Sequence, residues 1–218
     1  MITLAVLDLA GTTVSDDGVV TGAFEDVLDE MKIAGEERDR AVVYVIKTMG
    51  MSKIDVFRHL VGERADEANQ IFERSYEGRV RSGEVAPIGG AEVAVEALRA
   101  TGVRVCLTTG FSPATRDILL DSIGWHDLAD LVLSPTDAGR GRPYPDMILA
   151  AALRLGVEDV RDIAVAGDTA NDLLSGSRAG ASLVAGVLTG AHSREQLEEA
   201  PHTHIIESVV ALPDLIGP

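Results

Sequence analysis

Carboxylates in two short segments have the spacing that metal-dependent phosphoryl chemistry needs. Asp8 ends an apolar run and leads into a loop that contains one glycine and two threonines. Asp168 and Asp172 stand in the segment Gly-Asp-Thr-Ala-Asn-Asp, where a helical pattern begins. Such carboxylates suit Mg²⁺, which takes one or two of them and leaves room for a substrate phosphate. A carboxylate just after a buried strand can also act as a nucleophile.

Two further polar segments could bind phosphate oxygens. Thr108, Thr109 and Gly110 follow a second apolar run and offer a hydroxyl and backbone N–H groups. Arg142 lies between a glycine and a proline, so its cation is held close to the start of the next helical pattern. Each segment alone has an ordinary interpretation as a turn residue, a helix cap or a surface charge. Their combination favours a site.

The elements that carry these segments alternate between strand and helix. The predicted strands are residues 3–7, 103–108, 131–134, 163–166 and 182–187, and the helices between and after them are 91–100, 113–122, 145–155, 171–179 and 208–216. This alternation predicts an α/β fold with a Rossmann-like, doubly wound parallel sheet. Because ligands bind beyond the carboxyl ends of such strands, we expect the polar segments to meet there.

A block of helical sequence interrupts this alternation after the first strand. Apolar residues recur at three- and four-residue spacings in residues 20–33, 36–49, 53–61 and 65–80. Residues 84–90 are rich in glycine and proline, as in a linker. We therefore predict an α/β core from residues 1–14 and 85–218, with an all-helical cap inserted at residues 15–84.

Composition excludes several functional classes. The 218 residues carry a net charge of −16, which repels nucleic acid and anionic membranes. No apolar run approaches the ~20 residues of a membrane-spanning helix, and the first residues do not resemble a signal peptide, so we expect a cytoplasmic protein. A single cysteine, Cys106, excludes a disulfide framework and a cysteine-based zinc site. A small anionic substrate would need a local positive site.

The four polar segments resemble the four motifs of the haloacid dehalogenase superfamily, and the resemblance spans nearly the whole chain, including the inserted cap. Within that superfamily the chain resembles the phosphonatase branch, the phosphonoacetaldehyde hydrolases. The matching segments are Asp8-Leu-Ala-Gly-Thr-Thr, Met49-Gly-Met-Ser-Lys-Ile-Asp and Gly141-Arg-Pro-Tyr-Pro. Lys53 falls where that branch has its Schiff-base lysine. That branch also has a histidine three residues after the lysine, and this chain has Val56 there.

The resemblance implies a role for each matching residue. Asp8 would attack phosphorus and form an aspartyl-phosphate, and Arg142 would supply a fixed positive charge. Mg²⁺ would be held by Asp8, the backbone carbonyl of Ala10 and Asp168, with Asp172 in support. The residues implied to contact the substrate or its phosphoryl group are Thr12, Met49, Gly50, Thr108, Thr109 (through its N–H) and Gly110.

Ala10 and Lys53 together point to the bond that is cleaved. Phosphatases of the superfamily carry an aspartate where this chain has Ala10, and that aspartate protonates the leaving alcohol. A protonated imine on Lys53 would instead accept the electrons of a C–P bond, so no acid is needed at position 10. The apolar flanks of Lys53 favour the neutral amine that such chemistry needs. The alternatives are a phosphatase for a small phosphate monoester and a non-catalytic binding protein.

An apolar run in the predicted cap bears on oligomeric state. Residues 41–46 read Ala-Val-Val-Tyr-Val-Ile, which would suit either the interface of a homodimer or the core of the cap.

Overall fold

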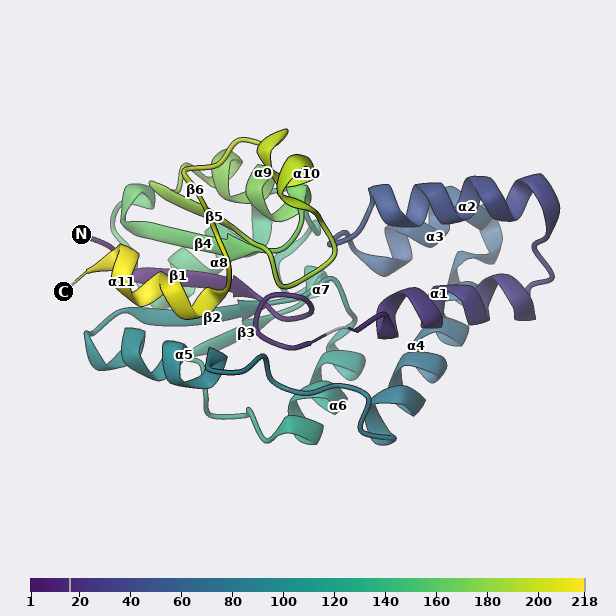
Figure 1. Ribbon diagram of the computed structural model, residues 1–218, viewed down its shortest axis with the longest axis horizontal. Coiled ribbons are helices and arrows are strands. Elements are labelled where there is room, and N and C mark those ends of the chain that lie inside the picture. Colours follow the sequence, from purple (N-terminus) through teal and green to yellow (C-terminus); the bar gives the residue numbers. More distant parts are fainter. Residues whose placement is uncertain (16, 218) are drawn as a thin grey trace.

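Six parallel strands form one sheet in the computed structural model, which describes residues 1–15 and 17–217 (Figure 1). In sheet order they are β3 (Leu131–Leu133), β2 (Arg104–Thr108), β1 (Leu4–Asp8), β4 (Ile163–Gly167), β5 (Leu183–Val187) and β6 (His204–Ile206). The predicted doubly wound sheet is thus confirmed. Because β1 lies between β2 and β4, Asp8 stands in the middle of the sheet's carboxyl edge.

The strands are buried because helices cover both faces of the sheet. Along β1, Ala5 and Leu7 pack on one side, and Leu4 and Val6 pack on the other. The first side is covered by α5 (Ala91–Ala100) and α11 (Leu212–Ile216), and the second by α8 (Asp146–Leu155) and α9 (Ala170–Ala179). The remaining core helices are α6 (Pro113–Ile123), α7 (Pro135–Ala138) and α10 (Arg194–Glu198), with 3₁₀ turns at Gly62–Arg64, Val160–Asp162 and Val209–Ala211.

Four helices lie together beyond the carboxyl ends of the strands, on the right of Figure 1. They are α1 (Val19–Glu30), α2 (Gly35–Lys47), α3 (Lys53–Val61) and α4 (Ala65–Arg81), and we call them the helical insertion. The rings of Phe24, Phe57 and Phe72, from three of these helices, pack with centroids 4.9–5.9 Å apart. Phe111 of the core joins them, 6.2 Å from Phe72, so the aromatic cluster connects insertion and core.

The chain enters and leaves the helical insertion at one place. The Ser15 N–H donates to the Ala86 carbonyl at 2.8 Å, and the Ile88 N–H donates to the Thr13 carbonyl at 2.9 Å. The boundaries proposed from the sequence, near residues 14 and 85, fall on this pair of segments. The predicted cap also includes Asp16, which lies outside the described residues.

Most elements agree with the sequence prediction to within a few residues, and the exceptions are short. Strand β6 was not predicted because its three residues form no apolar run. Helix α7 is a single turn that begins at Pro135 and is closed by a capping box between Ser134 and Asp137. The helix predicted at 208–216 is a 3₁₀ turn followed by α11.

The apolar run at residues 41–46 is divided between core and surface. Ala41 and Val45 are buried inside the helical insertion, whereas Val43 and Ile46 are exposed. Part of the run is therefore core, and the homodimer stays a prediction.

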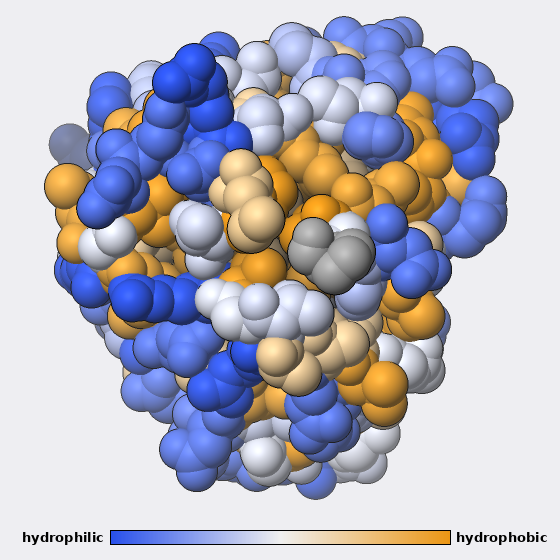
Figure 2. Space-filling view, turned by 90° about the vertical axis from the view of Figure 1, so that its left-hand side faces the viewer, coloured by the Kyte–Doolittle hydropathy of each residue, from blue (hydrophilic) through white to orange (hydrophobic). Residues whose placement is uncertain are grey.

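The end of the molecule opposite the insertion carries the N-terminus (Figure 1). Figure 2 shows this end: hydrophilic residues form much of its rim, and apolar residues gather nearer its middle.

None of the described helices is both long and apolar enough to cross a lipid bilayer.

Removing side-chain volume from β1 should destabilise the fold strongly. Leu7 is 0% exposed in the central strand, so Leu7→Ala should lower the free energy of unfolding by about 2–5 kcal/mol. Leu153 is 84% exposed on α8, and Leu153→Ala should change it by less than about 0.5 kcal/mol. Urea denaturation measures both, and equal effects would contradict the assignment of β1 to the core.

Candidate active site

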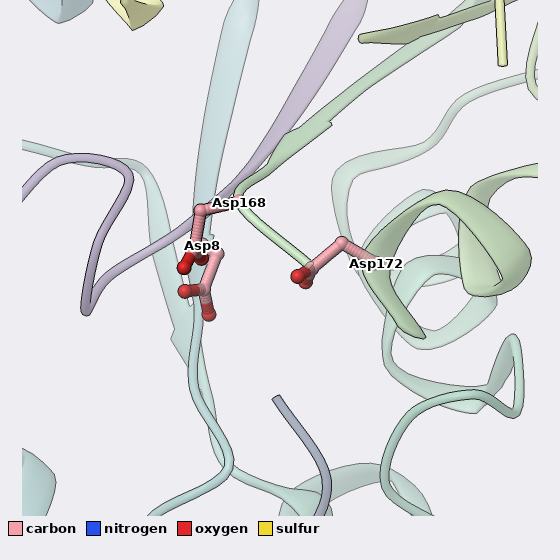
Figure 3. Close-up of side chains that lie close together, drawn as sticks. All are labelled: Asp8, Asp168 and Asp172. Atoms are coloured by element: carbon pink, nitrogen blue, oxygen red, sulfur yellow. The ribbon is translucent and has the colours of Figure 1, made fainter. Parts of the chain in front are cut away.

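Three buried carboxylates meet at the carboxyl edge of the sheet. Asp8 is the last residue of β1, and Asp168 directly follows β4, the strand beside it. Asp172 lies in the first turn of α9 and faces both of them (Figure 3). One oxygen from each of the three carboxylates lies within 4.8 Å of the others. The structure thus brings together the three acidic residues that the sequence singled out.

Arg142 lies against two of these carboxylates. Its Nη1 is 2.6 Å from Asp8 Oδ1 and also donates to Asp172 Oδ1. The side chain is buried, yet Nε and Nη2 have no hydrogen-bond partner within the described residues. Guanidinium donors in a buried position are usually hydrogen-bonded, so a water molecule or an anionic ligand can serve as the acceptor for these two atoms.

Burial sets the electrostatics of the site. It raises the pKa of Asp8 to about 7, although the adjacent Arg142 acts in the opposite direction. It also raises the pKa of Asp168 well above the usual range, and the charge of Asp8 adds to this effect. For Arg142, burial opposes the charge, but Asp172 and Asp8 outweigh it and raise the pKa. When all three carboxylates are ionised, one guanidinium leaves an excess of negative charge that a divalent cation would balance.

The residues around Asp168 hold its carboxylate in place. The Ala191 N–H donates to its Oδ2 at 2.7 Å, and the Thr12 hydroxyl donates to its Oδ1 at 3.3 Å. A Cβ on Gly11 would lie 2.4 Å from Asp168 Oδ2, and one on Gly190 would lie 2.1 Å from it. Backbone therefore packs closely around this carboxylate. Ala10, whose carbonyl the family resemblance implied as a ligand, lines one cavity together with Asp8 and Asp168, so the set of oxygen donors fits Mg²⁺.

The predicted phosphate-binding threonines differ in position. Thr109 and Gly110 line the cavity, but the Thr109 N–H already donates to the Leu133 carbonyl at 3.1 Å as part of the sheet. The Thr108 hydroxyl donates to the Leu7 carbonyl at 3.4 Å, and Thr108 does not line this cavity. The Thr12 hydroxyl donates a hydrogen bond to Asp168 Oδ1. Threonines near strand ends bond to the backbone readily, which sequence spacing does not reveal.

Lys53 shares the cavity with Asp8 and Arg142. The cavity has a volume of about 30 Å³, and Met49 and Gly50 of the insertion also line it. Lys53 is the first residue of α3 and is only 7% exposed. Its Nζ lies 5.4–6.0 Å from the ring centroids of Phe24, Phe72 and Phe111. Aromatic faces at this distance stabilise a cation and exclude water.

Sequence reasoning missed several residues around the site. Phe24 and Phe72 have the helical spacing of ordinary core residues, so nothing in the pattern marks them. Phe111 directly follows the Thr-Thr-Gly segment, a proximity that could have indicated it. The ring of His192 is buried, and its Nδ1 accepts from the Ala170 N–H at the start of α9. The Asn171 side chain binds the helical insertion directly.

Comparison with known proteins agrees with this geometry. The model of the haloacid dehalogenase-like hydrolase family matches residues 2–180. A probable phosphatase IndB of Dickeya dadantii is 29% identical over 213 residues, 94% of this chain and 89% of the relative. A phosphonoacetaldehyde hydrolase of Bacillus cereus is 29% identical over 230 residues, 94% of this chain and 84% of the relative.

Solved structures share the fold over almost the full length. A hydrolase from Pseudomonas syringae is similar with a TM-score of 0.84 at 24% identity, covering 98% of this chain and 97% of that one. A phosphonoacetaldehyde hydrolase-like protein from Oleispira antarctica has a TM-score of 0.83 at 22% identity, covering 99% and 91%. With the family match over most of the sequence, the chain belongs to the haloacid dehalogenase-like hydrolases and is an enzyme of that type.

Proposed function

We propose that this hydrolase cleaves the C–P bond of phosphonoacetaldehyde or a related small carbonyl phosphonate. The observation that carries the proposal is one cavity lined by the buried residues Asp8, Arg142 and Lys53. The carboxylate can attack phosphorus, the guanidinium can bind the phosphoryl group, and the amine can form an imine. The relatives named phosphonoacetaldehyde hydrolase support the same reaction class.

In the proposed reaction Lys53 acts first. Its amine adds to the substrate carbonyl and a water molecule leaves, which gives a protonated imine two atoms from phosphorus. The Asp8 carboxylate then attacks phosphorus in line. The electron pair of the breaking C–P bond moves into the imine, so the leaving group is an enamine. The enamine then takes up a proton at carbon and becomes an imine again. Water hydrolyses this imine and the aspartyl-phosphate, which returns both side chains to their starting state.

Charge around phosphorus is balanced by residues already in place. The buried Nε and Nη2 of Arg142 are suited to phosphoryl oxygens. Asp8, Asp168 and the Ala10 carbonyl would hold Mg²⁺, with Asp172 in support through Arg142. Bound there, Mg²⁺ would neutralise the repulsion between the nucleophile and the phosphoryl group.

The helical insertion and the core both contribute to the lining of this small cavity, Lys53 from one and Asp8 from the other. We therefore propose that the insertion opens on the paired segments near residues 15 and 86 and closes over the bound substrate.

Hydrolysis of a small phosphate monoester is the second candidate. The Dickeya dadantii relative is named a probable phosphatase, which favours it. Ala10 opposes it, because an alkoxide leaving group needs a proton and alanine has none to give. General acid catalysis is worth about 10²–10⁴-fold, so an ester would be a poor substrate unless another group supplied the proton.

Asp8→Asn should abolish turnover while leaving the fold intact. The amide is nearly the same shape but is a far weaker nucleophile and metal ligand, so kcat should fall by at least about 10³-fold. Release of inorganic phosphate measures the activity, and circular dichroism checks the fold. A variant that kept a tenth of the wild-type rate, a barrier change of ~1.4 kcal/mol, would contradict the nucleophile assignment.

Mg²⁺ should stabilise the protein more at high pH than at low pH. Burial raises the pKa of Asp8 from 3.8 to about 7 without metal, so the metal-free fold loses stability as pH rises from about 4 to about 7. Mg²⁺ binds only the ionised carboxylates. The rise in Tm on replacing EDTA with Mg²⁺ should therefore be larger at about pH 8 than at about pH 5. Asp168→Asn should remove most of that rise, and a pH-independent rise in both proteins would contradict the site.

Lys53→Arg separates the two candidate reactions. Guanidinium stays protonated and forms no imine, so phosphonate cleavage should fall to background. Borohydride added with phosphonoacetaldehyde should inactivate the wild type and leave a reduced adduct on Lys53. The chain has two other lysines, Lys32 and Lys47, so peptide mapping locates the adduct without ambiguity.

Lys47→Arg is the matched control, because Lys47 is exposed at the end of α2 and should keep full activity. If Lys53→Arg instead retained the wild-type rate on the preferred substrate, the Schiff-base route would be wrong. Hydrolysis of a phosphate ester by that variant would then establish the phosphatase.

A further inference from the structure

We propose that Asn171 is the positioning residue that holds Lys53 in the active site. It does so by binding the loop between α2 and α3, residues 48–52, which leads directly into Lys53. This role rests on the proposed function, because it matters for catalysis only if Lys53 takes part in the reaction. The physical contact itself can be tested without any substrate.

The contact joins the core to the helical insertion. Asn171 Nδ2 donates to the Met49 carbonyl at 2.7 Å, and the Asn171 side chain is 8% exposed. Asn171 lies in the first turn of α9, next to Asp172. Four residues after Met49, at the end of the loop, the Lys53 N–H donates to the Gly110 carbonyl at 3.2 Å. The loop is thus fixed to the core near both of its ends.

Close approach of backbone shows how tightly this loop is seated. A Cβ on Gly50 would lie 2.5 Å from the Thr169 hydroxyl, and one on Gly110 would lie 2.4 Å from the Met51 carbonyl oxygen. A Cβ on Gly141 would lie 2.9 Å from the Ser52 Cβ. Glycines of both partners make room where no side chain would fit. Such a close fit leaves few arrangements of the loop while it contacts the core.

Asn171 connects two parts of the site that the sequence keeps far apart. Its turn carries Asp172, whose carboxylate accepts from the Thr169 N–H at 3.1 Å and contacts Arg142. The loop that it binds supplies Met49, Gly50 and Lys53 to the cavity. Losing the amide donor would leave the buried Met49 carbonyl without this partner and weaken the loop's hold on the core. The Lys53 amine would then spend less time where it can meet a substrate carbonyl.

A purely structural role for Asn171 makes a different prediction. If the amide merely satisfied a polar group in the folded protein, its loss would lower global stability and would leave kcat unchanged in the folded fraction. A positioning role instead predicts a local change in the loop and a fall in kcat. A misplacement of about 1 Å can lower a rate by about 10²-fold.

Asn171→Leu tests the proposal, since leucine has a similar shape and no donor. Asn69→Leu is the matched control, because the only other asparagine of the chain lies on α4 and donates to Glu73. Four measurements are made on each protein: amide hydrogen exchange of the peptide covering residues 48–53 without substrate, kcat and KM for phosphate release from phosphonoacetaldehyde, the rate of borohydride trapping on Lys53, and the Mg²⁺ concentration for half-maximal activity.

For Asn171→Leu we expect exchange in residues 48–53 to become about tenfold faster while the β1 peptide is unchanged. The kcat and the trapping rate should fall together, by about 10–10²-fold, with the Mg²⁺ dependence preserved. Asn69→Leu should match the wild type in all four. Unchanged exchange in the loop, or faster exchange throughout the chain with kcat intact, would overturn the proposal.

Gly50→Ala provides a second route to the same contact. Its Cβ would strike Thr169 and Gly50 has a φ of +83°, so the loop should be displaced without any change at Asn171. If both variants act by unseating the loop, the double variant should be no slower than Gly50→Ala alone. Additive losses would contradict a shared mechanism. If phosphonoacetaldehyde is not a substrate at all, the proposed function fails, and loop exchange still decides whether Asn171 holds the loop against the core.

Discussion

The rest of the structure depends on the burial of three carboxylates beside one guanidinium. Removing Asp8, Asp168 and Asp172 from water is costly, and each ionised group needs a nearby partner. Arg142 supplies part of the compensation, through Asp8 and Asp172. The remaining carboxylate charge would favour a cation at the site and, through that cation, an anionic substrate. On the proposed function, a chain with a net charge of −16 would therefore bind a phosphoryl group without a basic surface.

This electrostatic arrangement explains why the sheet and the helical insertion are combined. Parallel neighbours β1 and β4 are needed to set Asp8 beside Asp168, and the edge that they share would be open to water without a cover. The insertion supplies the cover and adds the aromatic rings around Lys53. The low polarity of these rings strengthens the charge interactions among the buried carboxylates and Arg142. The linkers enter and leave side by side, which is the arrangement that the proposed opening of the insertion requires.

Much of this could be predicted from sequence because buried parallel strands are short apolar runs and their ends carry polar residues. Asp8 and Asp168 were found in this way, and α3 was predicted with its observed bounds, Lys53–Val61. What the sequence could not reveal depends on contacts between distant segments. Asn171 and Met49 are 122 residues apart, and neither residue type marks the pairing. The hydroxyls of Thr12 and Thr108 were expected near substrate, yet one binds Asp168 and the other a strand carbonyl. A local motif gives the residue but not the direction of its side chain.

The roles of Ala10 and Lys53 can be interpreted together because both residues line one cavity. An acid at position 10 would add a further carboxylate to a site in which burial already raises the pKa of Asp8 and Asp168. Such an acid is worth its electrostatic cost when the leaving group is an alkoxide, which must be protonated as it departs. On the proposed reaction the leaving group is neutral at the moment of cleavage, because the imine nitrogen takes up the electron pair. Alanine at position 10 then avoids the cost, and the protonated imine on Lys53 brings positive charge to a site rich in carboxylates. In the proposed reaction Ala10 and Lys53 therefore act together. The imine on Lys53 makes the leaving group neutral, and the absence of an acid at position 10 keeps a further negative charge out of the site.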